Sequence, residues 1–179
     1  LVQQILTISR KQNLDPKPLH LKNIAEEALK LLRATLPTTI EIREEFSRNM
    51  GIIHADPTQM HQVMVNLCTN AAHAMGEEGG VLEIGIRNME VGSDEPAFKH
   101  LNVPPGPYLR LTVSDTGTGM APDLVDKAFE PYFTTKEKGV GTGMGLSVVQ
   151  GIVKSHGGAI TVYSEPGMGS AFHVYLPLI

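Results

Sequence analysis

The stretch Lys138-Gly-Val-Gly-Thr-Gly-Met-Gly-Leu-Ser147 has a glycine at every second position from Gly139 to Gly145. Glycine has no Cβ atom, so the backbone N–H groups of such a run can approach a ligand closely. The segment 146–156 then carries apolar residues at helical spacing, which predicts a helix. A helix N-terminus that follows bare backbone donors favours an anion, most often a phosphate. The run therefore predicts a phosphate site, and a flexible linker is the alternative.

This run matches neither of the two common phosphate-binding fingerprints. The pattern G-x-G-x-x-G would need a glycine at position 144 or 146, where the chain has Met144 and Leu146. The residues before the run, 129–138, form a polar stretch broken by Pro131 and do not resemble a buried strand. A P-loop ends in Gly-Lys-Ser/Thr, and the chain has no such tripeptide. The predicted phosphate site is therefore of another kind.

A second set of alternating glycines lies upstream, in Asp115-Thr-Gly-Thr-Gly-Met120. It follows the segment 108–114, whose alternation of apolar and polar residues predicts a strand. A carboxylate at the end of a strand, beside open backbone, can accept two N–H donors or bind a metal. Asp-x-Gly is also a common turn, and the motif alone does not separate the two interpretations.

The segment 56–75 has the start signals of a helix. Asp56 suits the N-cap position and Pro57 the first helical position. Apolar residues recur every three or four positions and predict a buried face. They are Met60, Val63, Met64, Leu67, Cys68, Ala71, Ala74 and Met75.

The other face of this predicted helix carries a row of amides, Gln62, Asn66 and Asn70, with His73 three residues further on. Asparagine is unfavourable inside a helix, and a merely solvated face more often carries Lys and Glu. The row therefore predicts a polar ligand site, in which an Asn oxygen can bind a hard cation. An amide-rich surface is the alternative interpretation.

The remaining patterns predict a two-layer α/β sandwich. Asn23 and Glu26 form a candidate capping box for a helix that continues to about Leu36. A short helix is expected over 120–126, and Gly157-Gly158 is expected to end the helix that follows the glycine run. Strands are expected over 38–46, 51–54, 81–90, 108–114, 159–164 and 170–176. This order of elements favours helices on one face of a mixed sheet.

Composition limits the possible functions. The 179 residues are enough for one domain, and a net charge of -4 with a pI near 6.0 argues against nucleic-acid binding. No apolar run approaches the roughly 18 residues of a membrane span. The single cysteine, Cys68, fits a reducing compartment, so we expect a cytoplasmic location.

The N-terminal residues differ from the rest of the chain. Residues 1–11 have a helical apolar face, and Pro16 and Pro18 then interrupt the pattern. We therefore expect a helix end over 1–13, a linker over 14–18 and one ordered domain over 19–179. Because the chain begins in mid-pattern, we expect it to be part of a longer protein.

Four segments together resemble the nucleotide-binding domain of sensor histidine kinases. The wider group also holds type II topoisomerases, Hsp90 chaperones and MutL-like repair proteins. The segments are Gln62-Val-Met-Val-Asn-Leu-Cys-Thr-Asn-Ala-Ala-His-Ala-Met75, Asp115-Thr-Gly-Thr-Gly-Met120, Phe129-Glu-Pro-Tyr-Phe-Thr-Thr-Lys136 and Gly141-Thr-Gly-Met-Gly-Leu146. They stand in the family's order, and the resemblance covers nearly all of 19–179. It implies an α+β fold of the Bergerat type, with a mixed, mostly antiparallel sheet and about three helices on one face.

The resemblance also implies that the domain binds ATP with Mg²⁺. Asn70 would bind the Mg²⁺, and Asp115 would accept the exocyclic amine of adenine. The residues implied as catalytic are Asn66, Asn70 and Lys136. The residues implied in ATP binding are Asn66, Asn70, His73, Asp115, Gly117, Gly119, Met120, Thr135, Lys136, Gly141, Thr142, Gly143, Met144, Gly145, Leu146 and Ser170. Residues 134–143 would form a mobile lid, so we expect the helix after it to start later than its periodicity suggests.

Within the group, Asn66 favours a kinase over an ATP hydrolase. The hydrolysing relatives have a Glu there as general base, whereas an amide cannot take a proton. His73 stands where many members have Lys. The resemblance implies phosphoryl transfer to a histidine on a dimerisation helix of the same kinase, a homodimer in the full-length protein and a response-regulator partner. An ATP-driven clamp and a nucleotide-sensing module are the alternatives.

The phosphoacceptor histidine is expected outside this chain. In the family a His is followed by Glu or Asp, and by Pro five residues after the His. Only His100 has a proline at that offset, Pro105, but Leu101 follows it in a Pro-rich stretch. Residues 1–13 would then be the end of the dimerisation helix.

Overall fold

The computed structural model of the chain describes residues 15–92, 101–133 and 143–179. Its helices and strands follow one another along the chain. They are β1 (Lys17–Leu19), α2 (Leu21–Thr35), β2 (Ile40–Phe46), β3 (Ile53–Ala55), α3 (Pro57–Met75), β4 (Gly80–Val91), β5 (Gly106–Asp115), α5 (Pro122–Lys127), α6 (Gly145–Ser155), β6 (Ala159–Glu165) and β7 (Gly169–Pro177).

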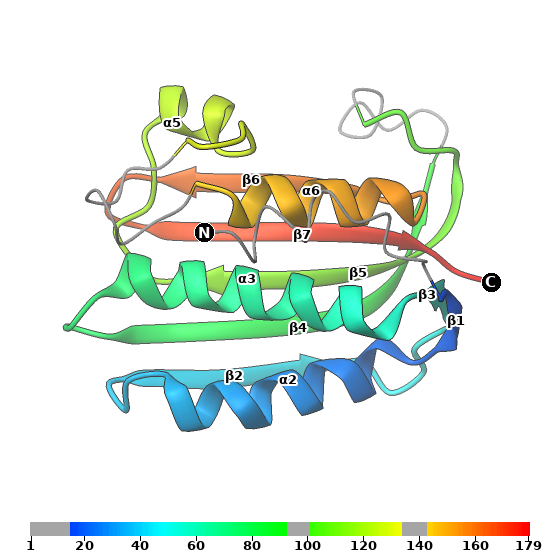
Figure 1. Ribbon diagram of the computed structural model, residues 1–179, viewed down its shortest axis with the longest axis horizontal. Helices are drawn as coiled ribbons and strands as arrows, with labels where there is room; N and C mark the ends of the chain where they lie inside the picture. Colours follow the sequence, from blue (N-terminus) through cyan, green and yellow to red (C-terminus); the bar gives the residue numbers. More distant parts are fainter. Residues whose placement is uncertain (1–14, 93–100, 134–142) are drawn as a thin grey trace.

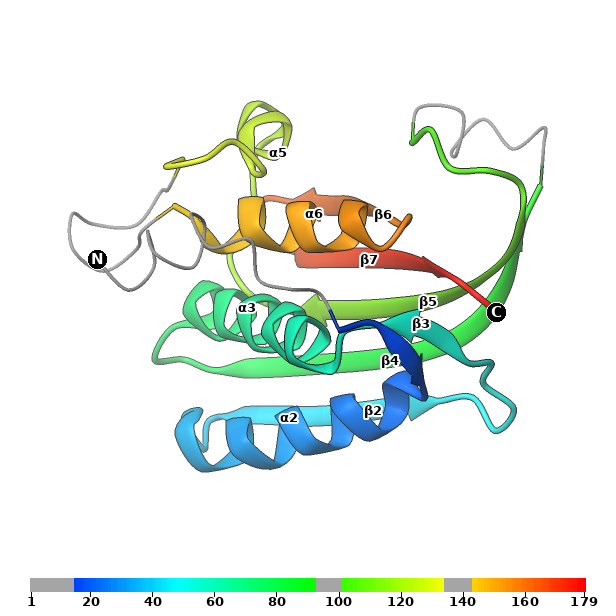
Figure 2. The ribbon, with the colours of Figure 1, turned by 45° about the vertical axis from the view of Figure 1, so that its right-hand side comes forward.

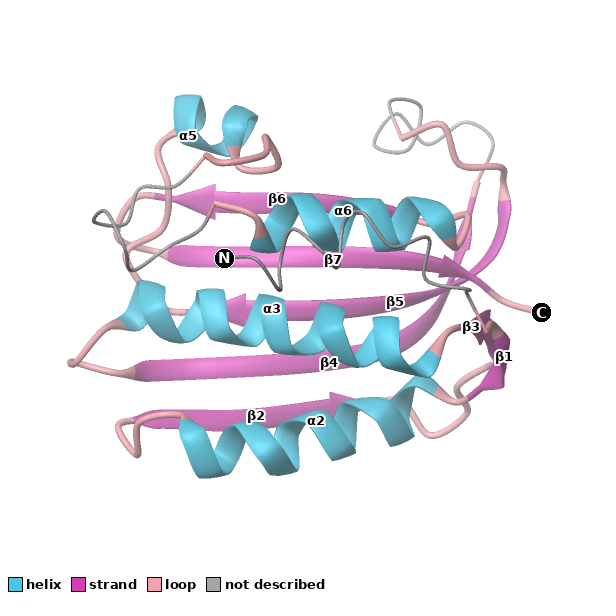
Figure 3. Ribbon diagram, viewed as in Figure 1, coloured by secondary structure: helices cyan, strands magenta, loops and turns pink. Residues whose placement is uncertain are grey.

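The main sheet has five strands in the order β2-β4-β5-β7-β6. Only β2 and β4 are parallel, and the other neighbours are antiparallel, so the sheet is mixed and mostly antiparallel as expected. Helices α2, α3 and α6 lie side by side over one face of this sheet (Figures 1 and 3). The turned view separates the helical layer from the sheet, with α5 beside the edge strand β6 (Figure 2). The predicted two-layer sandwich is confirmed.

The core lies between these two layers because each strand alternates its side chains between the faces of the sheet. Leu82, Ile84 and Ile86 of β4 point into the core, and so do Leu109 and Leu111 of β5. The other side of the core is formed mainly by the apolar face of α3.

The apolar face of α3 includes one residue that the sequence pattern did not assign to it. Ala72 is buried with the predicted residues, whereas Ala74 is only partly buried. Cys68 belongs to the same face, and burial raises the pKa of its thiol to about 12. The thiol therefore stays protonated and is unreactive at neutral pH.

The predicted start of α3 is confirmed in atomic detail. The Asp56 carboxylate accepts hydrogen bonds from the backbone N–H groups of Thr58 and Gln59 at 2.9 and 3.1 Å. Pro57 occupies the first turn, where its missing N–H costs nothing. Such a cap stabilises a helix by about 1 kcal/mol.

The predicted capping box at Asn23 is wrong. Helix α2 begins at Leu21, and His20 at the N-cap makes no side-chain cap bond. Leu21 is buried in the core, so packing rather than capping sets this helix start. Lys17 and Pro18, expected in a linker, instead lie in β1, which pairs with β3.

Helix α6 begins at Gly145 rather than later than its apolar periodicity, so that expectation is wrong. Its other end follows the prediction, because His156 is the C-cap and Gly157 has a φ of 70°. No helix in the described parts of the chain has both the length and the apolar character of a membrane span.

Candidate functional site

The two halves of the predicted site meet between α3 and α6. Asn66 and Asn70 lie one turn apart on α3, and both are partly buried. A Cβ atom on Gly145, the first residue of α6, would lie 3.6 Å from Asn70 Nδ2. The start of α6 therefore lies directly against the amide row. His73 is in the last turn of α3 and is exposed.

The N-terminus of α6 has the features of an anion site. Met144 occupies the N-cap position and makes no side-chain cap bond. The first backbone N–H groups of a helix have no partner within the helix, and the helix dipole adds partial positive charge there. An anion placed beside Asn70 would face this helix end.

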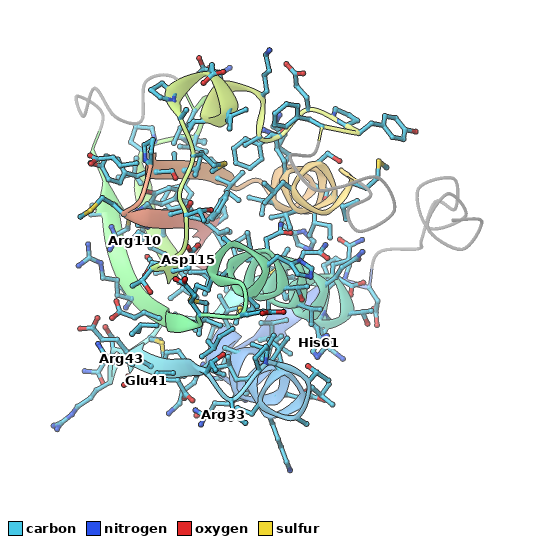
Figure 4. All side chains as sticks on the ribbon, turned by 90° about the vertical axis from the view of Figure 1, so that its left-hand side faces the viewer. Arg33, Glu41, Arg43, His61, Arg110 and Asp115 are labelled. Atoms are coloured by element: carbon cyan, nitrogen blue, oxygen red, sulfur yellow. The ribbon has the colours of Figure 1, made fainter. Side chains whose placement is uncertain are left out.

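Asp115 forms a second part of the site, at the end of β5. Its side chain is 7% exposed and accepts the backbone N–H of Gly117 at 2.8 Å. Burial raises the pKa of this carboxyl, and the backbone N–H groups of Gly117 and Ser170 oppose the rise more weakly. Figure 4 shows Asp115 on the helix side of the sheet and Arg110, on the same strand, on the opposite side. A buried carboxylate at this position is suited to accept N–H donors from a ligand.

Ser170 lies beside Asp115 on the neighbouring strand. The two residues are paired in the β5–β7 register, and directly opposite residues of antiparallel strands share a face. Ser170 is 8% exposed. In the described residues, Asp115 and Ser170 are the two buried polar residues, so they form one polar corner in an otherwise apolar core.

The glycines after Asp115 are needed by the protein's own packing. A Cβ on Gly117 would lie 2.6 Å from the backbone carbonyl of Ala74. Gly119 has a φ of 64°, and a Cβ there would overlap the carbonyl oxygen of Glu165. The loop is thus pressed against α3 and the β6–β7 hairpin, which only glycine allows. Close approach of adenine to these glycines stays a prediction.

Ser164 is a residue that the sequence analysis missed. It lies on β6, and its hydroxyl accepts the backbone N–H of Met120 at 2.8 Å. It also lies 2.8 Å from the hydroxyl of Ser170. The only sequence signal was a polar residue at an inward position of a predicted strand, which by itself indicates no site.

The aromatic segment 129–133 reaches the start of the α6 region. Phe129 packs edge-to-face on Phe172, with 6.3 Å between ring centroids. The backbone N–H of Tyr132 donates to the carbonyl oxygen of Gly143 at 3.0 Å. Four predicted site residues, Thr135, Lys136, Gly141 and Thr142, lie outside the described residues, as does most of the predicted lid.

The donor set fits Mg²⁺ only together with a ligand. In the described residues no group of three or more His, Cys, Asp or Glu side chains could hold a metal. Asn70 offers a neutral side-chain oxygen. Mg²⁺ commonly takes one or two protein ligands and completes its shell with substrate phosphates and water. The position of Asn70 beside the start of α6 fits this arrangement.

A cavity of about 840 Å³ lies away from these residues. It is bounded by residues 101–108 and by the C-terminal half of α6, including Gln150 and Lys154. None of the predicted site residues lines it. The converging amides, the carboxylate and the helix N-terminus, rather than the size of a cavity, therefore locate the candidate site.

Comparison with known proteins agrees with this location. The family profile described as histidine kinase-, DNA gyrase B- and HSP90-like ATPase matches residues 55–179. The chain is 41% identical over 177 residues to the sensor kinase CckA of Brucella abortus, covering 99% of this chain and 18% of that protein. It is 36% identical over 180 residues to the sensor histidine kinase ZraS of Salmonella typhimurium, covering 100% of this chain and 35% of that protein.

A solved structure gives the same result. The histidine kinase ThkA, in its complex with the response regulator protein TrrA, matches with a TM-score of 0.75 at 26% identity, covering 99% of this chain and 46% of that one. The chain spans less than half the length of each of these three relatives. The chain belongs to the histidine kinase-, DNA gyrase B- and HSP90-like ATPase family, as the ATP-binding domain of a sensor histidine kinase.

Proposed function

We propose that this domain binds ATP with Mg²⁺ between α3, α6 and the end of β5, and that the full-length protein transfers the γ-phosphoryl group to a histidine on its own dimerisation helix. In that step a bond forms between the histidine nitrogen and phosphorus, the bond from phosphorus to the β–γ bridging oxygen breaks, and ADP leaves. The observation that carries the proposal is the contact of Asn70 with the start of α6, on the same side of the sheet as buried Asp115.

Each part of the site has a distinct task in this proposal. The Asp115 carboxylate accepts N–H groups from adenine, and the α6 N-terminus receives the phosphates. Asn70 holds Mg²⁺, which supplies positive charge to the phosphates when bound. The predicted lid, with Thr135 and Lys136, covers the nucleotide. Catalysis then consists of positioning and electrostatic stabilisation.

The nature of Asn66 supports transfer over hydrolysis. It lies one turn before Asn70 on the same side of α3, and its amide cannot remove a proton from water. Transfer to a histidine side chain needs no base for water. We further propose a homodimer in the full-length protein, a response regulator as the next acceptor and a cytoplasmic location for the domain. The relative ThkA was solved in complex with such a regulator.

The test is an Asn70→Ala substitution in the full-length protein, followed by transfer of label from γ-³²P-ATP to the protein. We expect labelling to fall by about two orders of magnitude, because the metal and the phosphates lose a ligand. Gln62→Ala is the matched control, since Gln62 lies on the same side of α3 two turns before Asn70 and is assigned no role. Full labelling of the Asn70→Ala protein would refute the metal role. Steady phosphate release from the wild type without labelling would favour an ATP-driven clamp.

A further inference from the structure

The hydroxyl of Ser164 connects three segments behind the polar corner. It accepts the backbone N–H of Met120 at 2.8 Å and donates to the carbonyl oxygen of Gly169 at 3.0 Å. It also lies 2.8 Å from the hydroxyl oxygen of Ser170. Ser164 therefore ties the loop after Asp115 to both strands of the β6–β7 hairpin.

Counting protons fixes the direction of the contact between the two serines. A hydroxyl has one proton to donate, and a carbonyl oxygen can only accept. The proton of Ser164 goes to the carbonyl of Gly169, so Ser170 is the donor in the contact between the hydroxyls. The proton of Ser170 is thereby engaged, and towards a ligand Ser170 offers only lone pairs.

The polar corner is therefore made of acceptors. The Asp115 carboxylate accepts, and the Ser170 hydroxyl beside it accepts as well. Both are nearly inaccessible to solvent, so water cannot easily satisfy a mismatched ligand. The exocyclic amine of adenine donates hydrogen bonds and matches such a corner. Guanine has a carbonyl oxygen at the equivalent ring position, which would face acceptors and lose its hydrogen bonds.

We propose that Ser164 is a positioning residue for adenine selectivity: it keeps the Ser170 hydroxyl as an acceptor and holds the loop through Met120. The inference rests on the proposed nucleotide site and names the residue that sets its base preference. Ser164 itself acts through Ser170 and through the loop.

The test compares the affinities of the 179-residue chain for ATP and GTP, each with Mg²⁺, by titration calorimetry. In Ser164→Ala the proton of Ser170 loses its partner and can turn to the guanine carbonyl. We expect the preference for ATP over GTP to fall about five- to tenfold, the effect of one buried hydrogen bond. Ser164→Thr keeps a hydroxyl and should restore the preference. A merely structural role would weaken both nucleotides equally and leave their ratio unchanged.

A double-mutant cycle separates action through Ser170 from any other route. In a Ser170→Ala background, adding Ser164→Ala should change the preference less than twofold. Ser114→Ala is the control, because Ser114 adjoins Asp115 on β5 but pairs with Ala171 on the other face of the sheet. It should leave the preference unchanged. If Ser164→Ala does not fold, Ser164→Cys keeps the shape with a weaker donor and should show a smaller fall.

Three outcomes are decisive. An unchanged ratio in a folded Ser164→Ala protein overturns the role of Ser164. An equal effect with and without the Ser170 hydroxyl overturns the route through Ser170. A wild-type chain that binds neither nucleotide overturns the proposed site itself, and this inference with it, so the two failures are distinguishable.

Discussion

The two glycine-rich segments, 115–120 and 143–147, look alike in sequence but are held differently. Gly117 and Gly119 are enclosed by protein backbone, from Ala74 on one side and Glu165 on the other. Gly145 faces only the side chain of Asn70, at an ordinary contact distance. The first segment is locked into the fold, and the start of α6 faces a functional side chain.

This difference separates two uses of the same residue. In the first segment glycine is required for folding, because any side chain would collide with the backbone of neighbouring elements. At Gly145 the backbone conformation is ordinary, and the missing side chain leaves room next to Asn70. Substitutions in the two segments should therefore affect different properties, namely stability in the first and ligand binding in the second.

The largest effect is expected for Gly119→Ala. Its φ of 64° is unfavourable for alanine, and the new Cβ would overlap the carbonyl oxygen of Glu165. We expect a loss of about 2–4 kcal/mol in the free energy of unfolding, measured by urea denaturation. Thermal unfolding should shift down by roughly 5–15 °C.

Gly151→Ala is the matched control for this substitution. Gly151 is inside α6, and a Cβ there would meet nothing within 4 Å. Alanine should stabilise the protein by roughly 0.5–1 kcal/mol through helix propensity. Equal stability of the Gly119→Ala and Gly151→Ala proteins would contradict the view that the first segment is locked.

An intermediate effect is expected from the titration of Asp115. Burial raises its pKa, so between the ordinary carboxyl value of about 3.9 and the raised value the folded state binds more protons than the unfolded state. This group's contribution to stability is therefore present at low pH and is lost as the pH rises through the raised value. ATP affinity should change in the opposite direction and fall with falling pH, because a protonated carboxyl accepts fewer hydrogen bonds.

Both trends should disappear in Asp115→Asn. The comparison uses denaturation and ATP titration of the two proteins side by side across acidic to neutral pH, so that all other carboxyl groups cancel. Asp115→Asn should bind ATP weakly at every pH and should lack the destabilising buried charge near neutral pH. A wild-type ATP affinity that rises on acidification relative to the variant would refute the assigned role of the carboxylate.

The smallest effect is expected for Gly145→Ala. Alanine suits the first turn of a helix, so stability should change by less than about 0.5 kcal/mol. The added methyl group lies about one van der Waals contact from Asn70 and should weaken ATP binding only about three- to tenfold in a titration. A large loss of stability with unchanged ATP affinity would reverse the contrast between the two segments.

Much of the fold could be predicted because it depends on local patterns. The period of two in 108–114 and the Asp56-Pro57 start of α3 follow from strand geometry and from helix capping, and both are confirmed. The capping box at Asn23 failed because the burial of Leu21 outweighs a local side-chain bond. The strand at Lys17–Leu19 was missed because its partner is β3, more than thirty residues away.

The sequence by itself determined the chemical groups of the candidate site. The amides at helical spacing, Asp115 at the end of a strand and the glycine run could all be identified without coordinates, because each depends on near neighbours in the chain. Only the tertiary structure decided how they meet, with Gly145 against Asn70 and Ser164 behind Ser170 and Met120. These contacts join distant segments, and hydrogen-bond direction and steric fit depend on the distances that the packed layers set.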